Sequence, residues 1–229
     1  MTKMQKTETA ALLDLSKTIA ADLLKICKYP WEALPHIKGY IEELGAKLSE
    51  DDFDNPSEGV WIHKTAKVAP SASIGSPCII DEGAEIRHCA FIRGSAIVGK
   101  NAVVGNSVEL KNAILFDRVQ VPHFNYVGDS ILGYKSHMGA GAVTSNVKSD
   151  KTLVVLKKDG KPVFETGLKK FGAILGDNVE VGCNSVLNPG TVIGRECIIY
   201  PTSCVRGIIS ERTIWKFGGK TASREIKGE

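Results

Sequence analysis

Aliphatic residues recur at every sixth position along a large part of the chain. The series begins at Ile62 and runs without a miss to Leu110, and a small residue precedes most of its members by two positions. A helix has no period of six, and a half-buried strand alternates every two residues. A period of six fits a short strand and a turn that form one side of a triangular coil, with about 18 residues per turn. The pattern therefore predicts a parallel β-solenoid.

The same rhythm returns at Leu175 and continues to Val205, and between Phe116 and Thr144 it survives with two steps of five. Stacked coils bury one continuous apolar column, and each coil contacts only its neighbours. We therefore expect a mainly β protein, with about seven coils over 60–212. The ends of such a column need caps, for which the N-terminal segment and the tail 213–229 are available.

Residues 1–48 have a different period. Within 9–27 and again within 31–48, apolar residues fall at steps of three and four, which predicts two amphipathic helices separated at Pro30. Helices this short need a surface to pack on, and we favour the coil or a neighbouring subunit over a recruitment role. The acidic, turn-rich segment 49–59 is predicted to be a linker.

Residues 147–172 fit no hexad. Two β-prone runs flank Asp159-Gly160, which is a strong hairpin signal. We therefore predict a β-hairpin that protrudes from one corner of the coil. Its lysines are expected to be solvated unless the hairpin lies over a site.

Composition and charge narrow the function. The 29 basic and 26 acidic residues nearly cancel, so nothing favours nucleic-acid or membrane binding. The N-terminal sequence has no apolar signal core and no apolar run approaches ~18 residues, so a cytoplasmic location is expected. The six cysteines show no metal-type spacing, which predicts reduced thiols and no metal site.

The stretch from Asn106 to Asn146 interrupts the rhythm with polar residues, and such residues are better site candidates than those that obey it. Just before and within it, Arg93 and Lys111 are 18 residues apart. They should project outward from adjacent coils, about 4.8 Å apart. Two cations at that spacing suit a phosphate between them, although two solvated basic residues are the alternative.

Several motifs at consistent spacing resemble those of a known family of enzymes. They are FIRG with Arg93, GNSVELKNA with Lys111, PHFNYVGDS with His123, and MGAGAVTSN with Asn146. The segment resembles the acetyltransferase domain of the bifunctional enzyme that acetylates glucosamine-1-phosphate and then uridylylates it. It also resembles the C-terminal domains of archaeal sugar-1-phosphate nucleotidylyltransferases. The resemblance implies a left-handed β-helix, acetyl-CoA as acyl donor, an amino-sugar-1-phosphate as acceptor, and a homotrimer with sites at subunit interfaces.

The resemblance also implies roles for single residues on the acceptor side. His123 would take the proton from the amine that attacks the thioester, a task that suits a pKa near the working pH. Arg93, Lys111 and Tyr126 would hold the sugar phosphate. His137 stands where the family has a sugar-contacting asparagine, so the preferred sugar is expected to differ.

On the donor side, the resemblance gives Ala140 a backbone N–H that faces the thioester oxygen, where a fixed donor stabilises developing negative charge. Asn146 would lie beside the acetyl group and Cys183 on the CoA side. Lys148 is expected to reach a phosphate of the sugar or of CoA. Val147 replaces an aromatic residue of the family, which weakens the donor contact inferred there.

Other functions remain open at this point. Residues 1–60 contain no Gly-rich loop with Arg and Lys of the nucleotidyltransferase kind, so we expect no pyrophosphorylase activity. A non-catalytic sugar-phosphate-binding or assembly module is the first alternative. A metal-dependent hydratase of the carbonic anhydrase kind is the second, because His88 and His123 are about two coils apart; no third histidine is clearly in phase with them.

Overall fold

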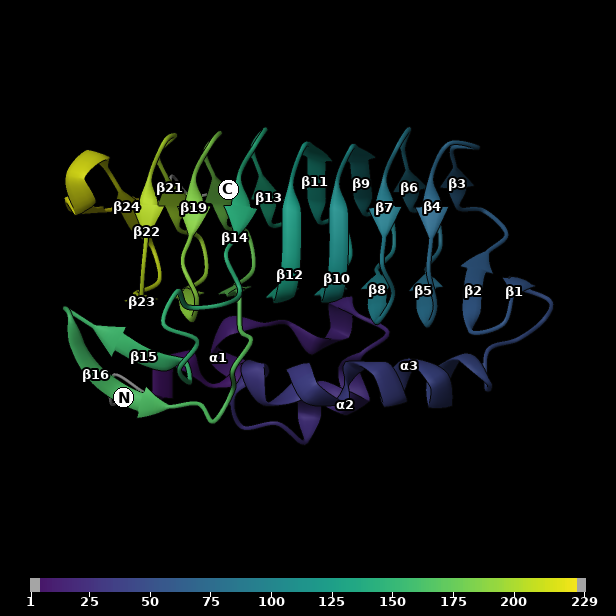
Figure 1. Cartoon of the computed structure of the whole chain (residues 1–229), viewed down its shortest axis with the longest axis horizontal. Helices are drawn as coiled ribbons and strands as arrows, with labels where there is room; N and C mark the ends of the chain where they lie inside the picture. Colours follow the sequence, from purple (N-terminus) through teal and green to yellow (C-terminus); the bar gives the residue numbers. More distant parts are fainter. Residues whose placement is uncertain (1–4, 226–229) are drawn as a thin grey trace.

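The computed structural model describes residues 5–225 and shows a mainly β protein, a β-solenoid of about nine turns. Short parallel strands stack side by side along the long axis, and helices run beside them (Figure 1). Within the described residues the strands form one sheet of 14, one of nine and a separate two-stranded hairpin. The larger sheet bends around a corner of the coil, because two of its strands pair with different neighbours at their two ends.

The strands lie on three faces of the coil. The first face holds β2 (Val60–His63), β5 (Cys78–Ile80), β8 (Ala96–Val98), the ends of β10 (Glu109–Leu115) and β12 (Tyr126–Leu132), β17 (Ala173–Leu175), β20 (Thr191–Ile193) and β23 (Ile208–Ile209). The second holds β3 (Lys67–Val68), β6 (Glu85–Ile86), β9 (Val103–Asn106), β11 (Gln120–His123), β13 (His137–Met138), β18 (Glu180–Val181), β21 (Ile198–Ile199) and β24 (Thr213–Trp215). The third holds β4 (Ser73–Ile74), β7 (Phe91–Ile92), the starts of β10 and β12, β14 (Val143–Thr144), β19 (Val186–Leu187) and β22 (Cys204–Val205).

The hexad positions fill the interior, as predicted. From Ile80 onward the aliphatic members of the series are buried, whereas Ile62, Val68 and Ile74 in the first coil are only partly buried. One assignment is corrected: the register pairs Leu115 with Val98, so Leu115 rather than Phe116 occupies the interior position. Both steps of five therefore fall inside β10 and β12, where the strand continues around the corner.

The corners of the coil require left-handed backbone. Non-glycine residues with positive φ recur along the coil, and Asn101 is one of them with a φ of 54°. Asparagine tolerates this conformation better than most residues, whereas a β-carbon with no local hydrogen-bonding group is disfavoured there by about 1 kcal/mol.

We expect Asn101→Ala to lower the free energy of unfolding by about 1 kcal/mol, while Asn101→Gly changes it little. Urea unfolding followed by circular dichroism measures both variants. Equal destabilisation by alanine and glycine would assign the effect to the lost side chain rather than to the backbone conformation.

The N-terminal segment is helical, but residues 9–27 do not form one helix. The elements are η1 (Gln5–Thr7), α1 (Thr9–Leu12), η2 (Leu15–Lys17), α2 (Ala21–Lys25), η3 (Pro30–His36) and α3 (Ile37–Gly45), where η marks a 3₁₀ helix. The break has a tertiary cause. The Asp14 N–H donates to the Asp177 carboxylate at 2.8 Å, and the Asp177 N–H donates to the Leu12 carbonyl at 3.1 Å. These bonds to the coil replace the bonds that would continue a helix.

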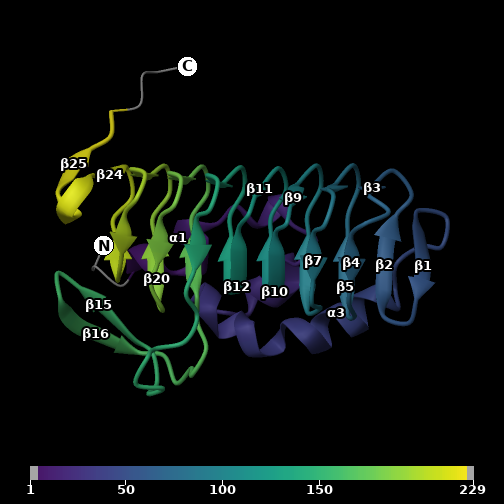
Figure 2. The same cartoon turned by 45° about the horizontal axis from the view of Figure 1, so that its top comes forward.

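The helical segment covers the first face of the coil. Outward-facing residues of this face are aliphatic and fully buried: Ile79, Ile97, Ile114, Ile131, Ile174 and Val192. α3 contacts β5, β8 and β10, and Figure 2 shows it running along these strands. Packing of the helices on the coil itself is therefore confirmed. No helix among residues 5–225 is long and apolar enough to span a membrane.

Both ends of the coil extend further than the sequence predicted. β1 (Phe53–Ser57), within the segment expected to be a linker, pairs antiparallel with β2. Within the expected tail, β24 continues the second face and β25 (Thr221–Ser223) closes it antiparallel, after the short η4 (Phe217–Gly219). These end strands account for about nine layers instead of about seven.

The predicted hairpin is confirmed as β15 (Val155–Lys158) and β16 (Lys161–Glu165), joined at Asp159-Gly160. It projects from the coil near β20 (Figure 2). Its Phe164 packs against the helical segment, with ring centroids 5.0 Å from Tyr29 and 5.6 Å from Trp31. The hairpin is therefore docked on the helices by aromatic contacts.

Candidate functional site

The two cations predicted to share a phosphate lie in register on the third face. β7 pairs with β10, and the Arg93 N–H donates to the Leu110 carbonyl at 2.8 Å. Each cation already has a carboxylate partner. Arg93 Nη1 lies 2.9 Å from Glu109 Oε1, and Lys111 Nζ lies 3.1 Å from Asp129 Oδ1. The expected pair of outward basic residues is present, but the chain supplies its own anions.

Asp129 is the centre of a network that the sequence did not reveal. Its side chain is only 4% exposed, and it accepts hydrogen bonds from Lys111, from Asn112 Nδ2 at 2.9 Å, and from Asn146 Nδ2. Asn112 also donates to the Leu34 carbonyl of the helical segment at 3.1 Å. A buried carboxylate with three nitrogen donors fixes residues from three successive coils in one arrangement.

Tyr126 joins this network. Its hydroxyl accepts a hydrogen bond from Asn146 Nδ2 at 3.2 Å. Burial raises the pKa of Tyr126, and the nearby carboxylates of Asp129 and Glu109 raise it further. The phenol therefore keeps its proton at neutral pH and is available as a hydrogen-bond donor. Asn146, expected beside the acetyl group, thus also contacts Tyr126 and Asp129.

His123 lies at the corner between the second and third faces. Ala140 and Cys183 occupy the same corner position in the next two coils, since the Gly141 N–H donates to the His123 carbonyl at 3.0 Å and the Asn184 N–H to the Ala140 carbonyl at 2.8 Å. The His123 side chain is exposed. This corner thus presents an imidazole, a backbone turn and a thiol in a column.

Asn125 holds this corner in place. It is 2% exposed; its Oδ1 accepts from the His123 N–H at 3.1 Å, and its Nδ2 donates to the Gly139 and Ala142 carbonyls, each at 2.9 Å. A buried amide with all three bonds satisfied is a rigid support. Asn125 lies within the stretch from Asn106 to Asn146 that interrupts the hexad rhythm.

Ala140 lies in the turn that Asn125 supports. The turn is closed by the Ala142 N–H, which donates to the Gly139 carbonyl at 3.1 Å. Among residues 5–225 no acceptor binds the Ala140 N–H, so this donor is available. Cys183 packs directly on the turn, because a β-carbon at Gly139 would lie 2.7 Å from the Cys183 nitrogen.

Two predicted site residues lie apart from these clusters. His137 is on the second face, where its Nδ1 lies 2.8 Å from Glu180 Oε2. Lys148 lies at the start of the hairpin segment, 3.3 Å from Asp150 and hydrogen-bonded to Thr152. Within the described chain, neither contacts the network around Asp129.

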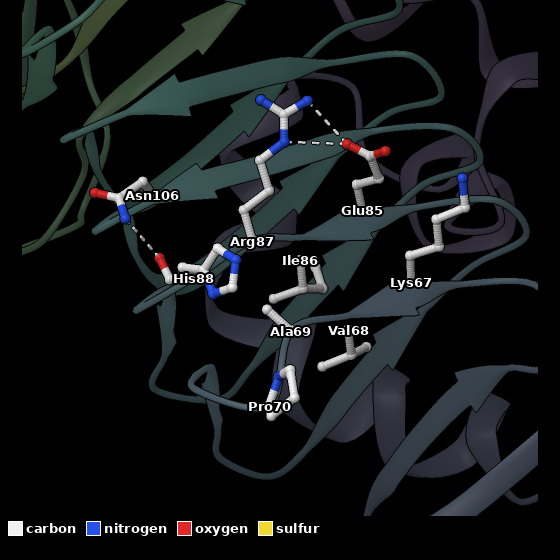
Figure 3. Close-up of a pocket in the computed structure, with 9 residues that line it drawn as sticks. All are labelled: Lys67, Val68, Ala69, Pro70, Glu85, Ile86, Arg87, His88 and Asn106. Atoms are coloured by element: carbon white, nitrogen blue, oxygen red, sulfur yellow. Dashed lines mark hydrogen bonds and ion pairs between the residues drawn. The ribbon is translucent and has the colours of Figure 1, made fainter.

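A cavity of about 550 Å³ lies on the second face, toward the N-terminal end from His123. Figure 3 shows the Arg87–Glu85 ion pair on one side of it and Asn106 bonded to the His88 carbonyl on another. Asn106 is the register partner of His123 on the adjacent strand. The cavity therefore ends one strand away from the candidate base.

The hydratase alternative requires a set of metal ligands. No group of three or more His, Cys, Asp or Glu residues in 5–225 is arranged to hold a metal ion. His88 and His123 do share one corner column, with Asn106 between them.

A three-faced coil with an aliphatic hexad core places the chain among hexapeptide-repeat β-solenoid proteins. The profile of the GMPPB C-terminal domain matches residues 76–182, and that of the bacterial transferase hexapeptide (six repeats) matches residues 172–207. The chain is a hexapeptide-repeat β-helix that resembles the C-terminal acetyltransferase domain of GlmU and of archaeal bifunctional nucleotidylyltransferases.

Individual relatives support the same resemblance. The bifunctional protein GlmU of Methanococcus maripaludis is 35% identical over 189 residues, which cover 75% of this chain and 42% of that protein. The bifunctional sugar-1-phosphate nucleotidylyltransferase/acetyltransferase of Sulfurisphaera tokodaii is 35% identical over 99 residues, covering 43% of this chain and 24% of the relative. The chain thus spans less than half the length of these relatives.

Among solved structures, a variant of AntD, an N-acyltransferase from Bacillus cereus, in complex with dTDP and coenzyme A is similar with a TM-score of 0.40. It is 17% identical in sequence, and the match covers 72% of this chain and 84% of AntD.

Proposed function

We propose that this chain is an acetyl-CoA-dependent N-acetyltransferase that acts on an amino-sugar-1-phosphate. The observation that carries the proposal is the corner where exposed His123 stacks on Ala140, whose N–H is available; the Asp129 network lies at the other edge of the same third face. The resemblance to GlmU and to a sugar-1-phosphate nucleotidylyltransferase/acetyltransferase supports both the donor and the acceptor class. Residues 5–45 form helices packed on the coil, and we propose no pyrophosphorylase activity for them.

In this mechanism, His123 accepts the proton of the amine as the nitrogen attacks the thioester carbonyl, and the exposed imidazole then protonates the departing thiolate. The Ala140 N–H donates to the carbonyl oxygen as it gains negative charge. A backbone donor held by a closed turn costs little reorganisation at that moment. Asn125 keeps the histidine backbone and this turn in a fixed relation.

Arg93 and Lys111 differ in how they would hold the phosphate. The Arg93–Glu109 pair is solvent-exposed, and such pairs contribute little to stability, so a phosphate displaces Glu109 at small cost. The Lys111–Asp129 pair is more buried and stays formed. The Arg93 side chain then leaves Glu109 and binds the phosphate, whereas Lys111 is a fixed positive charge beside it.

The same reasoning bears on assembly. The helices cover the first face, which leaves the second and third faces of the coil uncovered for contacts between copies of this chain. These faces meet at the His123 corner. A homotrimer formed through them, in the cytoplasm, brings a neighbouring copy next to His123; His137 and Cys183 then face that copy and not the network of their own chain.

We expect Tyr126→Phe to raise KM for the sugar phosphate about fivefold with little change in kcat, because it removes one neutral hydrogen bond worth about 1 kcal/mol. Steady-state kinetics with varied sugar phosphate measures it. The matched control is Tyr200→Phe. Tyr200 directly follows β21 of the second face and is 44% exposed. A larger fall in kcat than in affinity would show that the phenol acts in the chemical step instead.

Calorimetry separates the enzyme from the non-catalytic alternative. Titrations with glucosamine-1-phosphate and, separately, with acetyl-CoA should both show saturable binding. Binding of the sugar phosphate without binding of acetyl-CoA would favour a binding or assembly module over the transferase.

A further inference from the structure

A polar cavity of about 580 Å³ lies at the corner between the first and second faces, near the N-terminal end of the coil. Three parts of the chain line it. Ser16, Thr18 and Ile19 come from the helical segment, Asp52 and Phe53 come from the start of β1, and the rest comes from the corner itself. A ligand bound here would contact all three parts at once.

The charge of this cavity points to a cationic ligand. Its lining holds four carboxylates against one ammonium group, a formal charge of −3 with His63 neutral. Lys100 Nζ lies 2.9 Å from Glu82 Oε2, so the ammonium group is already paired. The surplus is negative and favours a cation as the occupant. The carboxylates are those of Asp52, Asp81, Glu82 and Asp117.

Asp81 gives a second, independent indication of a ligand. The residue is 2% exposed and its Oδ1 accepts from the Glu82 N–H at 2.7 Å. Its Oδ2 is buried and has no hydrogen-bond partner among the described residues. A buried carboxylate oxygen without a partner is costly, and in a folded protein such an atom indicates a bound ligand, ion or water. Asp81 therefore brings an unused acceptor to the wall of the cavity.

Asp117 brings a second carboxylate to the same place. Gly99 stacks beside Asp81, because the Asp81 N–H donates to the Val98 carbonyl at 2.9 Å. A β-carbon at Gly99 would lie 2.9 Å from Asp117 Oδ1, so the Asp117 carboxylate lies over this glycine, next to Asp81. Burial raises the pKa of both carboxyl groups, and the Asp81 charge raises the pKa of Asp117 further. A cation between the two carboxylates offsets both effects.

We propose that this cavity binds an aliphatic diamine, with one ammonium group between Asp81 and Asp117. An ammonium group has three donors and no acceptor, so it can donate to both carboxylates at once. Ile19 and Phe53 give the methylene groups an apolar wall, and a second ammonium group suits the remaining negative charge beside Asp52. A diamine fits better than a metal ion, since no three His, Cys, Asp or Glu side chains in 5–225 are arranged to hold a metal.

This site is separate from the proposed acetyl transfer. His123 lies at the corner between the second and third faces, whereas Asp117 lies at the corner between the first and second. The Asp117 N–H also donates to the Lys17 carbonyl at 3.0 Å, which ties the helical segment to the coil beside the cavity. A diamine that contacts both parts binds the folded chain only, and it therefore raises the unfolding temperature as its concentration rises.

Calorimetric titration of the full chain with 1,4-diaminobutane tests the proposal, with 1,4-butanediol as the uncharged probe and Mg²⁺ alone as the metal probe. The diamine should bind saturably and raise the unfolding temperature, and the other two probes should do neither. Asp81→Asn and Asp117→Asn should each weaken diamine binding about tenfold, as expected for loss of one charge-assisted hydrogen bond. Asp54→Asn is the matched control, because Asp54 follows Phe53 on β1 and does not line the cavity.

Thermal unfolding without ligand checks that the variants are folded. The folded chain raises the pKa of Asp81, so the Asp81 charge costs stability at neutral pH, and Asp81→Asn should unfold at or above the temperature of the parent chain. If Asp81→Asn unfolds early, Asp117→Asn carries the test, since Asp117 is only half-buried.

Absence of saturable diamine binding to the parent chain at millimolar concentration would overturn the proposal. Equal weakening in Asp54→Asn would do so as well, because it would show a general attraction to surface charge. Binding of Mg²⁺ alone that is lost in Asp81→Asn would assign the cavity to a metal ion instead. None of these results bears on thiol release at His123, so either proposal can fail while the other holds.

Discussion

His123→Ala is expected to lower kcat for acetyl transfer by about 10²–10⁴-fold, the usual contribution of a positioned general base. KM for the sugar phosphate should change little, because Arg93, Lys111 and Tyr126 lie on the third face and do not depend on the imidazole. The exposed side chain makes few contacts that stabilise the fold, so the variant should remain folded.

The matched control is His88→Ala. His88 shares the corner column of His123 but lies two coils away, on the far side of Asn106. Initial rates at saturating acetyl-CoA distinguish the two variants. Activity of His123→Ala within about threefold of the parent would exclude this histidine as the base, because general-base loss is expected to cost at least ~10².

Asp129→Asn is expected to lower the free energy of unfolding by about 3 kcal/mol and to raise KM for the sugar phosphate about tenfold. The amide keeps the shape of the carboxylate but removes the charge that pairs with Lys111, and its Nδ2 meets donors instead of acceptors. Breaking a buried ion pair from one side costs about 3–5 kcal/mol, and the partial exposure of Lys111 places this case at the lower end.

Urea unfolding and steady-state kinetics measure the two effects. Asp150→Asn is the control, since its pair with Lys148 is on the surface and its own side chain is 59% exposed. If Asp129→Asn and Asp150→Asn destabilise equally, the network around Asp129 does not hold the site together. If stability falls without a change in KM, Lys111 does not depend on Asp129 for its position.

The core of the fold can be predicted from the sequence, because each buried hexad residue follows from the six-residue period of the coil. The structure of the helical segment is harder to predict from the sequence. Its apolar steps are right, but Asp177 of the coil binds the backbone around Asp14 and breaks the helix there. The prediction that Phe116 faces the interior is wrong for a related reason. Aliphatic Leu115 and aromatic Phe116 are adjacent and both fully buried, so only pairing with Val98 shows which one faces the interior.

The candidate site can be predicted from the sequence only in part. The spacing of 18 correctly places Arg93 and Lys111 on adjacent coils, since it follows from the coil period. The carboxylates that pair with them are not visible in that spacing. Asp129 lies at a corner with a φ of 47°, where a polar residue looks like an ordinary turn residue. Only the stacking of Asn112, Asp129 and Asn146 on successive coils makes it a buried hub.

The most direct measurement is the release of CoA thiol from acetyl-CoA in the presence of glucosamine-1-phosphate or galactosamine-1-phosphate. We predict stoichiometric thiol release with an N-acetylated sugar phosphate as product, and loss of both in His123→Ala. Glucosamine without the phosphate should react poorly, because Arg93 and Lys111 then have nothing to bind. Saturable binding of both ligands without thiol release, or release that is unaffected in His123→Ala, would contradict the account.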